Sequence, residues 1–240
     1  EGAASLFSNE RLPVGRLYLR LKGQMKSWKM RLDLWGAALC FSAETTAGSV
    51  AGEIFACADR QLIAGQFQTS GSERAEWEFV PAVSESPRQA YGIHHQDPAR
   101  IQKGCRPNPP ARQWKEGDIC FALQELSRGA GIATAFRRAE EGKYLYLETC
   151  ARECSEDAAA EVRIMAGTDW DFEELKRAHR RWWADYYRQS FVTLPDGRME
   201  SFYWIQMYKL ASAARKDSPV MDNQGPWLTE TAWPGTWWNL

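Results

Sequence analysis

Apolar and polar side chains alternate with a period of two through most of the first 150 residues. Leu17, Leu19 and Leu21 are separated by residues that carry polar groups, and the same alternation recurs around Trp28. This period places successive side chains on opposite faces of a strand. No helical pattern supplies the long crossovers that parallel strands need. Residues 15–149 are therefore predicted to form an antiparallel β-sandwich or meander.

Turn-rich segments separate the expected strands. Residues 45–48 and 70–72 consist of Thr, Ala, Ser and Gly, which is typical of turns. Residues 84–115 lose the alternation and contain five prolines, so this stretch is predicted to be a loop. The expected strands cover residues 38–43, 50–56, 61–68, 75–80, 118–125, 131–138 and 143–150.

The predicted loop contains a polar cluster with two interpretations. His94 and His95 are followed closely by Asp97. Adjacent imidazoles and a carboxylate could ligate a metal or reach a neighbouring site. A solvated loop explains the same residues, and we favour this second interpretation.

After Cys154 the apolar spacing changes to that of helices. Residues 155–166 are predicted to form a short helix. Thr168 and Asp171 match a capping box, and apolar residues recur at helical spacing from Phe172 to Arg188. His179 lies within this second apolar stripe. A general base is possible there, but a core histidine is the favoured interpretation.

A third helix is predicted from Met199 to about Arg215. Its apolar residues cover most of the circumference, which indicates burial by other helices. Only a Trp-rich stretch follows this helix in the sequence. We therefore expect the rest of a helical domain to lie beyond Leu240.

The charge balance argues against a nucleic-acid partner. Lys and Arg number 30 against 31 for Asp and Glu, and the formal net charge is −1 without long runs of one sign. The longest apolar runs are far shorter than the ~20 residues that span a bilayer. The N-terminus lacks the pattern of a signal peptide.

The sequence also lacks the common metal and catalytic motifs. The six cysteines are scattered, and only Cys150 and Cys154 lie close together. That spacing does not match a zinc ribbon. We find no phosphate-binding loop, nucleophile elbow or zinc-protease helix. No metal site and no cofactor are therefore expected.

Tryptophan is concentrated near the end of the chain. Eight of the 12 Trp residues fall within residues 170–240, and residues 222–240 hold four of them among Pro, Gly and amide side chains. A Trp face can stack on the C–H face of a sugar, and amides can bind hydroxyls. The alternative is a loop whose Trp residues cap a core. The predicted substrate-binding residues are Gln224, Trp227, Trp233, Trp237 and Trp238.

Several motifs follow one another along the chain in a specific order and spacing. They are Pro-Val-Gly-Arg-Leu at residues 13–17, Arg-Leu-Asp-Leu at 31–34 with Ala37, Glu-Ile-Phe-Ala at 53–56 followed by residues 59–63, the helix residues His179, Trp182, Trp183 and Tyr187, residues 208–215, and residues 224–227, 233–235 and 239. Together they resemble the family-95 glycoside hydrolases, which comprise α-L-fucosidases and related α-L-galactosidases. In that family, the helix around His179 would be the linker helix and residues 208–215 would belong to the first barrel helix.

The resemblance implies an α+β architecture. An N-terminal antiparallel β-sandwich, the supersandwich of that family, would occupy residues 1–152. A helical linker would follow at residues 153–196, and the first helix of a truncated (α/α) barrel at residues 197–240. The first strands of the sandwich would precede Glu1. The chain would then be a fragment of a larger enzyme that is secreted or periplasmic, and the fragment alone would be inactive.

The resemblance also implies a mechanism and one catalytic residue. Family members hydrolyse the glycosidic bond with inversion at the anomeric carbon, using a glutamic acid as general acid and a water molecule that two asparagines hold. Asn239 matches the first of these asparagines. A carboxamide polarised by an anion can orient water opposite the leaving group. Trp237 and Trp238 replace a polar pair of the family, so the substrate sugar is left open. The second asparagine, the general acid and the anchoring aspartate would lie beyond Leu240.

Two other classes of protein fit the sequence. A non-catalytic carbohydrate-binding β-sandwich would use the Trp-rich stretch as its whole binding surface. An interaction module would instead bind a partner chain through the apolar third helix. In the leading interpretation, the partner is an oligosaccharide from plant or host glycans.

Overall fold

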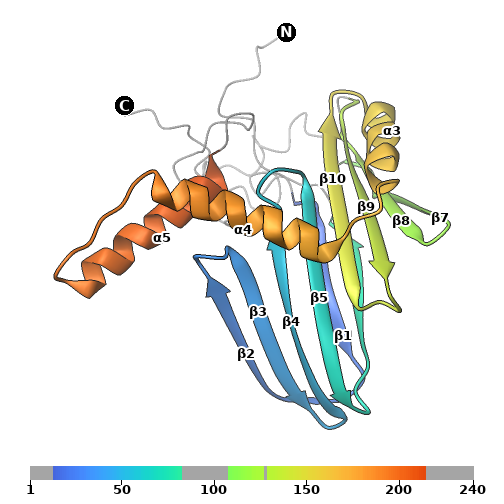
Figure 1. Cartoon of the computed structure of the whole chain (residues 1–240). Helices are drawn as coiled ribbons and strands as arrows, with labels where there is room; N and C mark the ends of the chain where they lie inside the picture. The colour runs from blue at the N-terminus through green and yellow to red at the C-terminus, as the bar shows by residue number, and fades with distance from the viewer. Residues whose placement is uncertain (1–12, 83–107, 127–128, 215–240) are drawn as a thin grey trace, which may run out of the picture.

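The computed structural model describes residues 13–82, 108–126 and 129–214 (Figure 1). These residues form a mixed α+β structure in which strands come first and helices follow. The strands are β1 (Gly15–Leu21), β2 (Met25–Asp33), β3 (Ala38–Thr45), β4 (Gly48–Ala56), β5 (Leu62–Gly71), β6 (Ala75–Pro81), β7 (Arg112–Glu116), β8 (Ile119–Glu125), β9 (Gly131–Ala139) and β10 (Tyr144–Arg152). The helices are α3 (Ser155–Ala166), α4 (Phe172–Arg188) and α5 (Gly197–Ala213).

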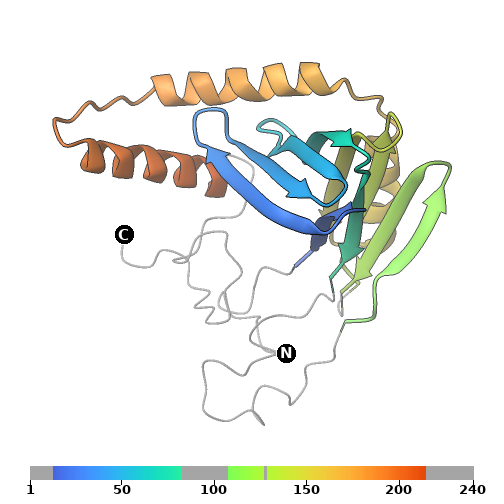
Figure 2. The ribbon, with the colours of Figure 1, turned by 90° about the horizontal axis from the view of Figure 1, so that it is seen from below.

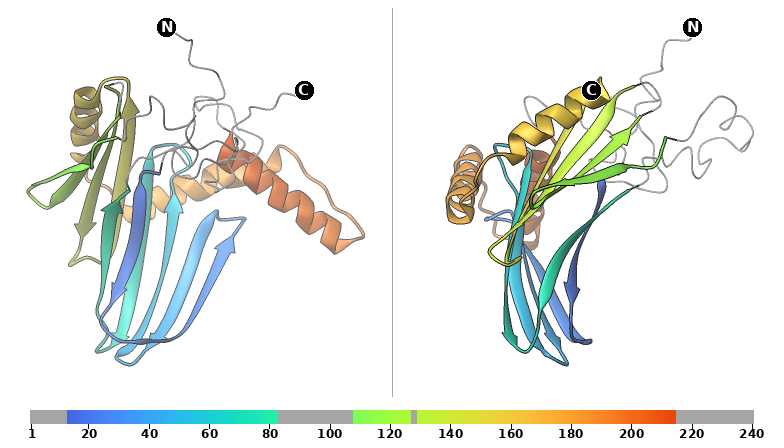
Figure 3. Two further views of the ribbon diagram at one scale, coloured as in Figure 1. Left: turned by 180° about the vertical axis from the view of Figure 1, so that it is seen from behind. Right: turned by 90° about the vertical axis from the view of Figure 1, so that its right-hand side faces the viewer.

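The strands form two antiparallel sheets, as the period of two predicts. The larger sheet has eight strands in the order β2-β3-β4-β5-β10-β9-β8-β7, and the smaller sheet pairs β1 with β6. Figure 3 shows β1 and β6 packed against the middle of the larger sheet, with β2 and β3 extending past β1. The result is a sandwich-like arrangement in which one layer is much wider than the other.

Alternation along the strands divides the larger sheet into two faces. The inner face packs on β1 and β6, and its centre consists of Phe67, Leu145 and Leu147 against Trp77. The outer face is covered by helices (Figure 2). This two-sided burial explains why β5 and β10 are more continuously apolar than β2.

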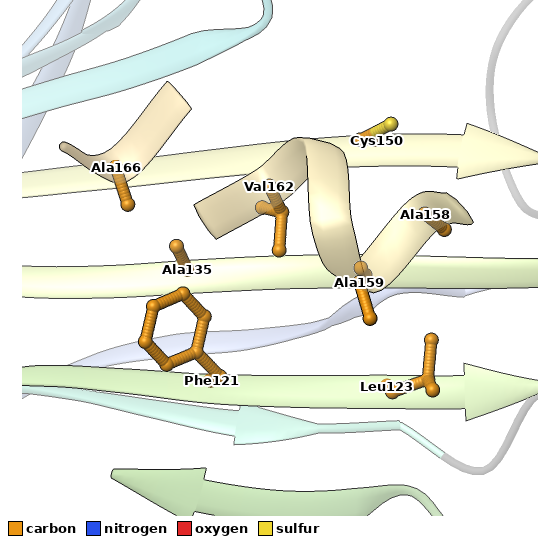
Figure 4. Packing of buried hydrophobic residues seen from close by; sticks show 9 residues of the cluster. Phe121, Leu123, Ala135, Cys150, Ala158, Ala159, Val162 and Ala166 are labelled. Carbon is orange, nitrogen blue, oxygen red and sulfur yellow. The ribbon is translucent and has the colours of Figure 1, made fainter. Parts of the chain in front are cut away.

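Helix α3 lies close to the outer face because its buried residues are small. Ala158, Ala159 and Val162 are fully buried against β8, β9 and β10. Figure 4 shows them directed toward the strands that carry Ala135 and Leu123. A Cβ atom on Gly131 would lie 2.7 Å from the Cα of Ser155, so glycine is required where the helix begins.

Helix α4 crosses the other part of the outer face. Phe172 and Leu175 pack on Ala38, Phe55 and Ala64. A salt bridge from Lys176 to Glu53, with both side chains largely buried, fixes the helix above β4. The side chain of Asp171 accepts a hydrogen bond from the amide of Glu174 at 2.7 Å, so it is the N-cap in place of the predicted Thr168.

Helix α5 returns beside the C-terminal half of α4 (Figure 2). Trp183 stacks on Tyr208 with ring centroids 5.4 Å apart, and Tyr187 meets Trp204 edge to face. The opposite side of α5 is exposed, and Phe202 there is 58% accessible. The predicted burial on most sides is therefore not seen within the described residues, and the (α/α) barrel stays a prediction.

Strand β7 lies in a stretch whose prolines predict a loop. It pairs in register with β8, and Trp114 stacks on Phe121 at 5.2 Å. The guanidinium carbon of Arg163 in α3 lies over the ring of Trp114, 5.0 Å from its centroid, in a cation–π contact. These tertiary contacts account for a strand that local composition does not indicate.

Among the described residues, no helix combines the length and the apolar character that a membrane crossing requires. The five cysteines in this part of the chain, Cys40, Cys57, Cys120, Cys150 and Cys154, are free thiols.

Candidate functional site

The sugar-binding residues predicted from the sequence lie outside the described residues. These are Gln224, Trp227, Trp233, Trp237, Trp238 and the predicted catalytic residue Asn239. The loop cluster of His94, His95 and Asp97 also lies outside them. All of these assignments stay predictions.

His179 is a core residue, as the favoured interpretation of the apolar stripe predicts. Its side chain is 2% exposed, and its ring stacks on Phe55 with centroids 4.6 Å apart. The Nε2 atom lies 3.0 Å from the carbonyl oxygen of Gly36 and 3.2 Å from that of Ala37. Because a carbonyl can only accept, Nε2 carries the proton. The histidine thus holds the turn between β2 and β3 against α4.

An open groove lies on the inner face, where β2 and β3 extend past β1. It encloses about 420 Å³, and its wall is apolar apart from Ser42. Met25, Trp28 and Met30 of β2 are 57%, 65% and 53% exposed along its rim. The lining residues are Leu17, Leu19, Leu21, Met25, Trp28, Met30, Leu39, Phe41, Ser42, Ala43, Val50, Ile54 and Trp77.

The groove exists because the two sheets differ in width. Trp28 is opposite Ala43, and Met30 is opposite Phe41, so these side chains share one face of the larger sheet. β1 pairs with β6, and no other described strand is hydrogen-bonded to it. The apolar row on β2 therefore has no second layer above it in the described structure.

Trp77 gives the groove a buried polar atom. It belongs to β6, is 4% exposed, and contacts Phe41 and Phe67 through its ring. Its indole Nε1 has no hydrogen-bond partner within the described residues. A buried donor without an acceptor is unfavourable. Because the Nε1 atom is itself buried, a group in the open groove does not reach it in this structure.

The strands that bound the groove are strongly basic. Residues 15–33 contain six Lys or Arg residues and one acid, Asp33. Of the six, Arg20 alone is joined to an acidic side chain in the described structure, namely Glu78. Alternation along β2 places Lys29 and Arg31 on the face opposite Trp28 and Met30, so these two cations do not face the groove. The residues that line the groove include no pair of ionisable groups.

Two buried glutamates elsewhere have opposite electrostatic surroundings. Glu73 accepts hydrogen bonds from the amides of Lys22 at 2.8 Å and Arg74 at 2.9 Å, and from the hydroxyl of Thr45. The Thr45 bond, followed by those of the backbone amides, lowers the pKa of Glu73 below its usual range. The carboxylate joins three turns at one end of the sandwich.

Glu148 is buried beneath the connection between α3 and α4. Burial raises its pKa, and the indole N–H of Trp170, which donates to its Oε1 at 2.9 Å, opposes part of that rise. Burial likewise raises the pKa of the nearby Cys57 thiol to about 12, so this cysteine is an inert core residue at neutral pH. No group of three or more His, Cys, Asp or Glu is placed to hold a metal ion in the described ranges.

Sequence reasoning did not identify the groove. The alternation around Trp28 correctly predicts that one face of β2 is apolar, but it does not say whether a second layer covers that face. The sequence signal that could have indicated the groove is the row of large apolar residues on β2. These residues are exposed because β2 is the edge strand of the larger sheet and the smaller sheet does not reach it.

Searches against models of protein families and against curated proteins found no match to this chain.

Proposed function

We propose that this chain is the N-terminal part of a glycoside hydrolase that resembles the family-95 enzymes. The β-sandwich would occupy residues 1–152, the helical linker residues 153–196, and the first part of an (α/α) barrel residues 197–240. The enzyme would act on plant or host glycans outside the cytoplasm. In this proposal, catalysis needs carboxylates that follow Leu240, so the chain alone binds sugar without hydrolysing it.

The arrangement of the helices is the observation that carries the proposal. A sandwich-like pair of sheets leads into α4, and α5 packs on α4 with one side. The other side of α5 exposes Met199, Phe202 and Ile205. Exposed apolar rows of this kind pack on further helices in helical domains. An (α/α) barrel would supply those helices.

The proposed chemistry follows from the residues near the end of the chain. Trp227, Trp233, Trp237 and Trp238 would form a wall on which a sugar ring stacks, and Gln224 would bind its hydroxyls. Asn239 would accept a hydrogen bond from water and direct it to the anomeric carbon. A general acid beyond Leu240 would protonate the leaving oxygen from the opposite face, which inverts the configuration.

An activity assay on the full-length gene product tests this proposal. We expect it to hydrolyse p-nitrophenyl α-L-fucoside or α-L-galactoside, and proton NMR should show the β-anomer as the first product. Absence of hydrolysis on both substrates, or an α-anomer as first product, would contradict the proposal.

Asn239→Ala in the full gene product should lower kcat by about 10²-fold or more while KM changes little, because water is activated only in the transition state. The matched control is Asn223→Ala, which removes a nearby amide with no assigned role and should leave kcat unchanged. A rise in KM at constant kcat would show that Asn239 binds substrate and does not orient water.

A second candidate is a carbohydrate-binding module that uses the sandwich itself. The observation that favours it is the exposed Trp28 at the rim of the groove. A flat aromatic surface beside a groove can accept a sugar ring. This candidate predicts sugar binding that depends on Trp28 and not on the Trp residues near Leu240.

A further inference from the structure

We propose that the connection between α3 and α4 is a pH-sensitive latch, in which Glu148 of β10 holds Trp170 and releases it on losing its proton. The latch lies at the junction where the sandwich leads into α4. It uses neither the groove nor the residues near Leu240, so the proposal is independent of the proposed activity on sugars.

The connection, residues 167–171, is attached to the sheet mainly through one side chain. Trp170 is half-buried against the cluster that contains Phe55, whereas the other four residues are exposed. The guanidinium of Arg137 adds one hydrogen bond, to the carbonyl oxygen of Thr168 at 2.8 Å. The segment contains no helix or strand. Because segments with few buried contacts open locally at a small cost in free energy, this connection can open while the sheet stays folded.

Glu148 is the inner half of the latch. It is 4% exposed, and its Oε1 accepts a hydrogen bond from the indole N–H of Trp170 at 2.9 Å. Within the described residues, Glu148 has no second hydrogen-bond donor on its side chain and no salt bridge. A buried carboxyl group with one donor favours its neutral form. Opening of the connection would hydrate the group, so ionisation of Glu148 favours the open form.

The closed form should be favoured in acid. Burial raises the pKa of Glu148 in the closed form, and in a hydrated open form the pKa would return to about 4.3. The stabilisation of the closed form is therefore fully present below the ordinary pKa. It is lost as the pH rises through the raised pKa.

Two cations flank the latch and keep their charge throughout this range. Arg137 of β9 attracts the charged form of Glu148 and opposes part of the effect of burial. The guanidinium carbon of Arg60 lies over the ring of Trp170, 5.0 Å from its centroid. Arg60 is also paired with Asp59, and the hydrogen bond between them lowers the pKa of Asp59. These contacts position the ring, while Glu148 is the group whose charge changes.

Four other titratable groups lie in the same surround. Cys57 and Tyr146 belong to the cluster on which Trp170 packs, and burial raises the pKa of each to about 12, so both stay neutral below pH 8. Asp169 and Asp171 belong to the connection itself and are exposed to water. Glu148 is therefore the buried carboxyl group of this surround.

Hydrogen exchange tests the latch on the whole chain. Amide exchange is followed by mass spectrometry at pH 4 and pH 7, and each rate is divided by that of an unfolded peptide of the same sequence. At pH 7 we expect residues 167–171 to exchange about threefold or more faster in the wild type than in Glu148→Gln, because the amide carries no charge. At pH 4 the two proteins should exchange alike. Equal exchange in both proteins at pH 7 would overturn the proposal.

A low concentration of urea separates local opening from global unfolding. Exchange of residues 167–171 in the wild type should hardly change in dilute urea, because local opening exposes little new surface, whereas exchange of β9 should accelerate. If the connection accelerates as steeply as β9, Glu148 affects only global stability and there is no latch.

Trp170 reports its own release. In protein labelled with 5-fluorotryptophan, the fluorine resonance that is missing in Trp170→Phe belongs to Trp170. We expect this resonance to titrate between pH 4 and pH 8 in the wild type and to stay constant in Glu148→Gln. The matched control is Asp169→Asn, which removes an exposed acid from the same connection and should leave the titration unchanged. A resonance that titrates in Glu148→Gln, or stays constant in Asp169→Asn, would overturn the assignment of the switch to Glu148.

Discussion

Glu73 and Glu148 are both buried, yet their surroundings shift their pKa values in opposite directions. Glu73 is surrounded by donors, namely the hydroxyl of Thr45 and the amides of Lys22, Gly23 and Arg74, which favour the charged form. Glu148 accepts a hydrogen bond from the indole of Trp170, and burial, which favours the neutral form, is the larger influence on its pKa. The difference follows from the number of hydrogen bonds that each carboxylate accepts.

Glu73→Gln should destabilise the fold at neutral pH, because an amide cannot accept all the hydrogen bonds that the carboxylate accepts. The folded pKa of Glu73 is lowered. The advantage of the wild type is therefore fully present above the unfolded pKa of about 4.3 and is lost as the pH falls through the lower folded pKa. Thermal unfolding of both proteins between pH 7 and pH 3 checks this. A difference in melting temperature that stays constant down to pH 3 would be inconsistent with it.

Glu148→Gln should have the opposite effect at neutral pH. A carboxyl group whose folded pKa is raised is destabilising when the pH exceeds both its folded and unfolded pKa values. The amide keeps an acceptor for Trp170 without the burial of a charge. We expect the variant to melt at a higher temperature than the wild type at pH 7, with the gain disappearing below about pH 4.3. A lower melting temperature at pH 7 would mean that the charge of Glu148 stabilises the fold.

At the scale of elements, helix α3 depends on small side chains. Ala159 is fully buried between the helix and the sheet (Figure 4). Ala159→Leu should destabilise the protein by about 1–3 kcal/mol, because added methylene groups in a close-packed layer force the helix away from the strands. Denaturant unfolding monitored by circular dichroism measures the change.

Ala160→Leu is the matched control for this helix, since Ala160 is exposed one residue further along. It should change the free energy of unfolding by no more than about 0.5 kcal/mol. Equal losses in the two variants would mean that helix propensity, and not packing against the sheet, governs α3.

The helices were the elements that the sequence predicted best. Residues 155–166 and 172–188 match α3 and α4 because a strong apolar period and a terminal Gly or Asp mark their limits. Helix α5 begins two residues earlier than predicted, since Asp196 caps it by accepting from the amides of Arg198 and Met199. A helix N-cap depends on where its side chain points, and the spacing of apolar residues along the sequence does not show this.

Strand pairing and exposure were harder to predict. The alternation in β2 indicates a strand with one apolar face, but Trp28 is largely exposed because the smaller sheet stops at β1. Strand β7 was missed because it is held by the stacking of Trp114 on Phe121 and not by local propensity. The width of each layer is a property of the assembled sheets, so it cannot be read from a single strand. The predicted sugar site lies outside the described residues and was neither confirmed nor contradicted.

In the part of the chain that the structure describes, exposed apolar side chains gather on two surfaces. One is the groove on the inner face of the wider sheet, and the other is the outer side of α5. They lie on different elements, and the helical spacing of the exposed residues on α5 favours packing by further helices. The proposed hydrolase accounts for the second surface through its barrel.

The most direct test of the proposed function is a titration of this chain with a fucosylated or galactosylated oligosaccharide, in which tryptophan fluorescence reports binding. We predict saturable quenching in the wild type, its loss in the Trp237→Ala/Trp238→Ala double variant, and its retention in Trp28→Ala. Loss of quenching in Trp28→Ala alone would assign sugar binding to the sandwich groove. Absence of any sugar-dependent change in the wild type would contradict a carbohydrate-binding role for the residues near Leu240.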